Sequence, residues 1–283
     1  MSIVRERSVV IVDAHLHVWR AAPEFPNPSV TVVSPLSDVP FQLLEQYMEE
    51  YGVDRAVLVQ PLYPGEDNIY VANCAASNPA KFASVCVVDP RKADALSRLT
   101  YWVKDGGCRG LRLRPRVPEE AGCFGEPSTF PIWEFAQEAK IVVSVLGDFA
   151  HLEALAKLAR RFSDVPIVVD HLAHPADVEP GACEPLLTLS ECPNVLLKIS
   201  GFPHFCNEPY PYRGCIPLVR AVHARFGAER MIWGSDFPHV LLQSGYSRAL
   251  HWLERTCDFL DASEVDLILG GNASRLYWRK GTY

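Results

Sequence analysis

Short apolar segments rich in Val, Ile and Leu recur along the chain, and a stretch of helical periodicity follows each one. The apolar segments show little alternation between hydrophobic and polar positions, which is typical of strands covered on both faces. We predict eight strands, at residues 9–14, 55–60, 82–88, 110–113, 141–146, 166–170, 195–200 and 231–234. We predict helices at residues 41–50, 68–77, 93–104, 131–139, 149–162, 184–190, 216–226 and 247–260.

Eight alternating strand and helix units in 283 residues predict an α/β fold, a single (β/α)8 TIM barrel that spans residues 1–283 as one domain. Residues 263–269 and 273–278 predict a C-terminal helical extension. A doubly wound open sheet is the alternative, but no Gly-x-Gly-x-x-Gly turn follows the first strand. Two long Pro-rich loops, 23–40 and 202–213, follow the first and seventh strands, at the barrel face that carries active sites.

Composition and charge narrow the class of partner. The chain is 48% hydrophobic and 22% charged, as expected for a globular protein, and Lys+Arg 27 against Asp+Glu 34 gives a formal net charge of −7. We therefore expect neither nucleic acid nor a membrane surface as partner, and no apolar run approaches the roughly 20 residues that span a bilayer. No secretory signal is evident, so we expect a cytoplasmic protein in which most of the nine cysteines are reduced. The oligomeric state is left open, a homo-oligomer included.

The candidate chemistry lies at the ends of three predicted strands. The first ends in Asp-Ala-His15-Leu-His17, where two imidazoles two residues apart project to the same side of an extended backbone. The sixth ends in His171 and the eighth in Asp236. A closed barrel would bring all four side chains to one mouth, where they could hold a metal ion.

Other polar residues mark the same face of the predicted barrel. Arg112 and Arg114 lie on one side of the fourth strand, and the planar guanidinium suits recognition of a carboxylate. Lys198 interrupts an apolar strand, where it either points toward the substrate or forms a structural ion pair. Further candidates for substrate binding are Gln60 and His239, with Tyr63, His204 and Tyr212 as weaker ones.

Six segments in order along the chain carry a family resemblance: VDAHLHVW, GLRL, VDHLAHP, LLKISGF, WGSDFPH and GGNASRLYW. From Val12 to Trp278 the chain resembles the amidohydrolase superfamily, specifically its amidohydrolase-2 branch, which includes 2-pyrone-4,6-dicarboxylate lactonase and sugar-lactone hydrolases. The resemblance implies a TIM-barrel hydrolase that opens a lactone of a small carboxylated or polyhydroxylated compound.

The resemblance also assigns roles. It implies that His15, His17, His171 and Asp236 form the metal or catalytic cluster, that Asp236 is the general base assisted by His171, and that Arg112 binds a substrate carboxylate. The ligand that metal-dependent members carry at the end of the fifth strand is missing here, where the strand reads Ile141-Val-Val-Ser144-Val. One divalent ion, Zn²⁺ or Mn²⁺, and a metal-free site therefore both stay open.

Two other functions compete with lactone hydrolysis. Related barrels include metal-dependent decarboxylases of small aromatic or muconate-type acids, although the missing fifth-strand ligand counts against that chemistry here. A barrel that only binds a small acid is the second alternative, and the presence of His15, His17, His171 and Asp236 counts against it.

Overall fold

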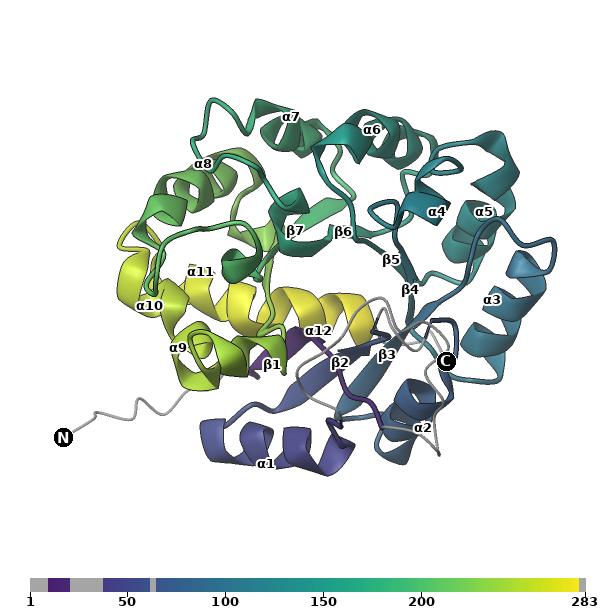
Figure 1. Ribbon diagram of the computed structural model, residues 1–283, viewed down its shortest axis with the longest axis horizontal. Coiled ribbons are helices and arrows are strands. Elements are labelled where there is room, and N and C mark those ends of the chain that lie inside the picture. Colours follow the sequence, from purple (N-terminus) through teal and green to yellow (C-terminus); the bar gives the residue numbers. More distant parts are fainter. Residues whose placement is uncertain (1–9, 21–37, 62–64, 280–283) are drawn as a thin grey trace.

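The computed structural model describes residues 10–20, 38–61 and 65–279, so most of the loop 23–40 and Tyr63 lie outside the described part. Eight parallel strands pair in chain order from β1 to β8 (Figure 1). The strands are β1 (Val12–Leu16), β2 (Arg55–Val59), β3 (Phe82–Val87), β4 (Gly110–Leu113), β5 (Val142–Val145), β6 (Ile167–Val169), β7 (Val195–Ile199) and β8 (Met231–Trp233).

The two ends of the sheet meet and make it a nearly closed barrel. Past β8, the Asp236 amide donates to the His15 carbonyl at 2.8 Å, and the His17 amide donates to the Phe237 carbonyl at 2.7 Å. We call this junction between β1 and the segment after β8 the seam of the barrel. The buried carboxylate of Asp13 lies in the seam and accepts hydrogen bonds from the Ser235 amide and the Tyr246 hydroxyl. The predicted TIM barrel is confirmed.

Helices between the strands cover the outside of the barrel (Figure 1). They are α1 (Phe41–Tyr51), α2 (Ile69–Ser77), α3 (Ala95–Lys104), α4 (Pro118–Ala121), α5 (Phe130–Glu138), α6 (Leu152–Arg161), α7 (Glu184–Leu187) and α8 (Ile216–Phe226). After β8 follow α9 (Tyr246–Leu250), α10 (Trp252–Thr256), α11 (Ala262–Asp266) and α12 (Asn272–Tyr277). The prediction of a single helix at 247–260 is wrong, because the helix is interrupted at His251. Beyond this interruption the indole of Trp252 donates a hydrogen bond to the Pro211 carbonyl.

The interior of the barrel has its own apolar core, separate from the layer between strands and helices. Small and β-branched strand residues such as Val12, Val57 and Val85 point inward, as the strand pattern requires. Tyr277 of α12 packs among them, so the predicted C-terminal extension is part of this core. Asn272 anchors α12 by donating to the carbonyls of Ala228 and Met231 at 2.7 Å.

Candidate active site

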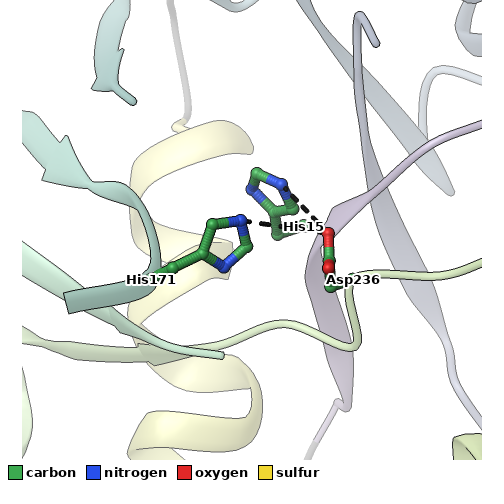
Figure 2. Close-up of side chains that lie close together, drawn as sticks. All are labelled: His15, His171 and Asp236. Atoms are coloured by element: carbon green, nitrogen blue, oxygen red, sulfur yellow. Dashed lines mark ion pairs between the residues drawn. The ribbon is translucent and has the colours of Figure 1, made fainter. Parts of the chain in front are cut away.

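Four side chains from three strand ends gather at the mouth of the barrel. The Oδ1 atom of Asp236 lies 3.7 Å from Nε2 of His15, 3.6 Å from Nε2 of His17 and 3.9 Å from Nε2 of His171. All four residues are buried. Figure 2 shows His15 and His171 both facing the Asp236 carboxylate. The structure thus brings together the cluster that the strand ends predict.

The other ring nitrogen of each histidine contacts a different partner. Nδ1 of His17 lies 2.8 Å from the Val59 carbonyl, and Nδ1 of His171 lies 2.9 Å from the Ser200 hydroxyl. Nδ1 of His15 lies 2.9 Å from the Lys198 ammonium. These contacts fix the ring orientations, as outer contacts of catalytic and metal-binding histidines commonly do.

His171 and Asp236 both stand on unusual backbone. Four successive residues, from His171 to His174, have positive φ values between 47° and 57°, and Asp236 has a φ of 60°. Left-handed backbone costs about 1–2 kcal/mol for each residue with a side chain. Such conformations cluster at functional sites, where the surrounding structure holds them in place.

Asp236 is an ionised carboxylate in this setting. Burial alone raises its pKa, but the neighbouring His171 and hydrogen bonds with His17 and His204 outweigh burial and hold the pKa well below its usual range. His204, from the short turn Phe202–His204 after β7, lies with Nε2 2.6 Å from the second carboxylate oxygen. From sequence, His204 is only a weaker candidate, because nothing in a loop sequence shows which strand end the loop contacts.

His15 and His171 are held neutral. Burial is the main cause that lowers the pKa of both His15 and His171 well below the usual value, and the nearby Lys198 charge adds to the effect on His15. Neutral imidazoles can serve as hydrogen-bond donors, as acceptors or as metal ligands.

A buried ionic network centred on Asp170 adjoins the cluster, and Lys198 of this network contacts His15. Asp170 accepts hydrogen bonds from Arg112 Nε at 2.9 Å, from Lys198 Nζ at 2.8 Å and from Ser144 Oγ at 2.7 Å. Although burial opposes this, Lys198 and Arg112 hold the pKa of Asp170 well below its usual range. Burial lowers the pKa of Lys198, and the Asp170 charge opposes that shift. Asp170 and Ser144 are not among the site residues that the sequence pattern predicts.

The remaining predicted substrate-binding residues occupy different places. Lys198 is fully buried in the ion pair with Asp170, which matches the structural alternative left open from sequence. Arg114 is paired with the buried Glu120, and the Gln60 amide donates to the carbonyls of Gly65 and Asp67.

His239 lies at the mouth, where its ring centre is 5.8 Å from that of His17. Substrate binding by Arg112, Arg114, Lys198, Gln60 or His239 stays a prediction.

The donor set includes a candidate metal site. One ligand atom each from His15, His171 and Asp236 lie within 4.8 Å of one another, and all three residues are buried. Within the described residues, Nε2 of His15 is buried without a hydrogen-bond partner.

Comparisons with known proteins agree with the fold. The amidohydrolase family model matches residues 12–279. The L-fucono-1,5-lactonase of Burkholderia ambifaria is 32% identical over 278 residues, which cover 94% of each protein.

Solved structures share the barrel. An amidohydrolase from Burkholderia multivorans with bound zinc is 24% identical, with a TM-score of 0.81 over 95% of this chain and 99% of that one. A probable 2-pyrone-4,6-dicarboxylic acid hydrolase from Acinetobacter baumannii, with citric acid bound, is 21% identical, with a TM-score of 0.80 over 95% of this chain and 99% of that one.

None of the helices in the described ranges has the length and apolar character to cross a membrane.

Proposed function

This chain belongs to the amidohydrolase family, and from that premise we propose that it hydrolyses a lactone, the cyclic ester of a small carboxylated or polyhydroxylated acid. The observation that carries the proposal is the ionised Asp236 carboxylate facing three imidazoles in a buried mouth. The lactonase relative supports a sugar-derived lactone as the first substrate class to test.

The proposed reaction uses Asp236 as general base. Its Oδ1 takes a proton from water while the water oxygen bonds to the lactone carbonyl carbon. The carbonyl oxygen becomes negatively charged, and imidazole N–H groups at the mouth stabilise that charge. The ring C–O bond then breaks, and the leaving oxygen receives the proton that Asp236 took, which yields the open hydroxy acid.

The cluster also fits a divalent ion. His15, His171 and Asp236 offer two imidazole nitrogens and one carboxylate oxygen within 4.8 Å of one another, and Nε2 of His17 lies 3.6 Å from the same carboxylate oxygen. A bound Zn²⁺ or Mn²⁺ would polarise the carbonyl and acidify water. On β5, the strand that lacks the further ligand, Ser144 donates a hydrogen bond to Asp170.

Substrate recognition is assigned to the rim of the mouth. The Nε atom of Arg112 is committed to Asp170, which orients the guanidinium plane. We propose that its remaining nitrogens bind a carboxylate or hydroxyl oxygen of the substrate, with His239 as a neighbouring contact.

A lactone panel tests the proposal. Sugar 1,5-lactones, muconolactone and pyrone dicarboxylate are assayed by acid release with a pH indicator, with and without chelator, beside metal analysis of the purified protein. We expect Asp236→Asn to lower the turnover of the best lactone by about 100-fold to 10,000-fold. Asp258→Asn, at a side chain that is 86% exposed, is the matched charge control.

Two results would count against lactone hydrolysis. One is a panel in which no lactone is opened, and the other is an Asp236→Asn protein as active as the control. Release of CO₂ from an aromatic or muconate-type acid, abolished by chelator, would establish the decarboxylase alternative instead.

A further inference from the structure

A cavity lies beside Asp236, between the ends of β7 and β8 and the helices α9 and α10. Asp236 is in its lining, and so is Ser200, whose hydroxyl contacts His171. The half-exposed Tyr210 and the exposed Gln243 line it from the loops after β7 and β8, so the cavity opens on the barrel face that carries the mouth. Its volume of about 30 Å³ holds about two water-sized groups, and therefore a substituent of one or two carbon atoms.

The walls of this cavity are largely apolar. Buried aromatic and aliphatic side chains form much of the lining, among them Phe202, Tyr212, Trp233, Trp252 and Leu253. The indole N–H of Trp233 donates to the Ala249 carbonyl at 3.2 Å, and that of Trp252 donates to the Pro211 carbonyl at 2.7 Å. Because both N–H groups are already bonded, these rings offer a ligand only carbon surface.

The buried hydroxyl groups in the lining have partners as well. Ser235 Oγ accepts a hydrogen bond from the Phe237 amide at 2.9 Å, and the Tyr212 hydroxyl forms a hydrogen bond with Ser244. A hydroxyl group placed in this space would lose its bonds to water without an evident replacement, which is unfavourable. An alkyl group has no such bonds to lose and gains by leaving water.

One short turn separates the cavity from the mouth. Phe202 and Pro203 line the cavity, and the next residue, His204, contacts the Asp236 carboxylate at 2.6 Å with a side chain that is 33% exposed. Gly201 precedes the turn with a φ of +65°, and a glycine at the end of an element is a position where a short segment can pivot. A small movement of this turn would join the cavity to the mouth.

We propose that this cavity is an apolar subsite of the active site, which takes a methyl or ethyl substituent of the lactone when the turn Phe202–His204 moves aside. The substituent is carried by the ring carbon that bears the leaving oxygen, next to the C–O bond that breaks. The proposal rests on the lactonase function and narrows its substrate to lactones that have a short alkyl group at this carbon.

The subsite is tested first in the wild-type protein with three sugar-acid 1,5-lactones. They differ only at the carbon that bears the leaving oxygen, which carries hydrogen, methyl or hydroxymethyl. We expect kcat/KM for the methyl lactone to exceed that for the hydrogen lactone by about 10-fold or more, and that for the hydroxymethyl lactone by about 10-fold to 100-fold. Equal kcat/KM for the hydrogen and methyl lactones would overturn the subsite, although lactone hydrolysis itself would stand.

A variant that fills the cavity gives the second test. Ala249 lines the cavity from a half-buried position on α9, and alanine and leucine are both good helix formers. In Ala249→Leu the ratio of kcat/KM between the methyl and hydrogen lactones should fall to about one, while the hydrogen lactone is still opened. Ala156→Leu, at a half-buried position of α6 outside the lining, should keep the wild-type ratio. A wild-type ratio in Ala249→Leu would overturn the assignment of the cavity.

Two measurements separate this proposal from the lactonase function. Xenon, which enters apolar cavities, should occupy this one in crystals of the wild type and be absent from it in Ala249→Leu. A wild-type cavity without xenon would overturn the proposal, whatever the substrate is. If the wild type opens no lactone, the lactonase function fails, and calorimetry with the three corresponding open-chain acids decides the subsite. Binding of the methyl acid that is tighter than that of the hydrogen acid by about 10-fold would retain it, and equal binding would overturn it.

Discussion

Replacing Gly201 by alanine tests how tightly the fold positions His171. Gly201 follows β7 with a φ of +65°, and a Cβ atom built there would lie 2.4 Å from Nδ1 of His171. Ordinary contact begins at 3.4 Å, so the imidazole must move by about 1 Å and lose its hydrogen bond to Ser200. The left-handed backbone adds about 1–2 kcal/mol of strain, and the lost hydrogen bond about 1 kcal/mol more.

Gly52→Ala is the matched control for this substitution. Gly52 ends α1 with a φ of +66°, and nothing lies within 4 Å of an added Cβ. Both variants carry the backbone strain, but only Gly201→Ala moves His171. By urea unfolding we expect Gly201→Ala to be less stable than Gly52→Ala by about 1–2 kcal/mol.

The activity of the two variants should differ more than their stability. A displacement of about 1 Å in a catalytic group can lower turnover by about 100-fold. Lactone opening in Gly201→Ala should fall by that factor, while Gly52→Ala keeps wild-type turnover. Equal stability and equal turnover in the two variants would refute the claim that Gly201 makes room for His171.

Two further predictions concern the barrel seam and acid stability. Tyr246→Phe removes the hydroxyl that donates to the buried Asp13 carboxylate at 2.8 Å. In urea titrations the free energy of unfolding should fall by about 1.5–3 kcal/mol. A loss below about 0.5 kcal/mol would show that the seam does not depend on this hydrogen bond. Burial lowers the pKa of His174 and of His239 from 6.5 to about 4, so the unfolded chain binds more protons below pH 6.5 and stability is lost as pH falls. From pH 7 to pH 5 these two histidines should together account for about 4 kcal/mol of that loss, measured as the difference between the wild type and the double variant His174→Gln/His239→Gln. Equal losses in both proteins would contradict this.

The barrel and its four-residue cluster were accessible from sequence for a simple reason. Buried parallel strands have a recognisable apolar pattern, and their carboxyl ends must meet at one face, so His171 and Asp236 could be placed near His15 without coordinates. Element boundaries were less accurate: β1 ends at Leu16, so His15 lies within the strand that was predicted to end at residue 14.

The ionic network around Asp170 could not be predicted, because it depends on register across several strands. Asp170 contacts Arg112, Ser144 and Lys198 from three other strands, and only the observed pairing shows that they meet. The left-handed turn that begins at His171 is equally hidden, because its sequence contains no glycine to indicate positive φ. For Lys198 the sequence left two roles open, and the choice needed the position of Asp170.

The seam between β1 and β8 has a consequence for the order in which the molecule is assembled. The hydrogen bond from the Ser235 amide to Asp13 joins positions 222 residues apart, and Tyr277 reaches the interior core still later in the chain. During synthesis one edge of β1 therefore stays unpaired until almost the entire barrel has been made. Contacts between such distant positions slow folding and leave strand edges exposed to wrong partners. The cluster that pairs His15 with Asp236 is consequently among the last parts of the molecule to form.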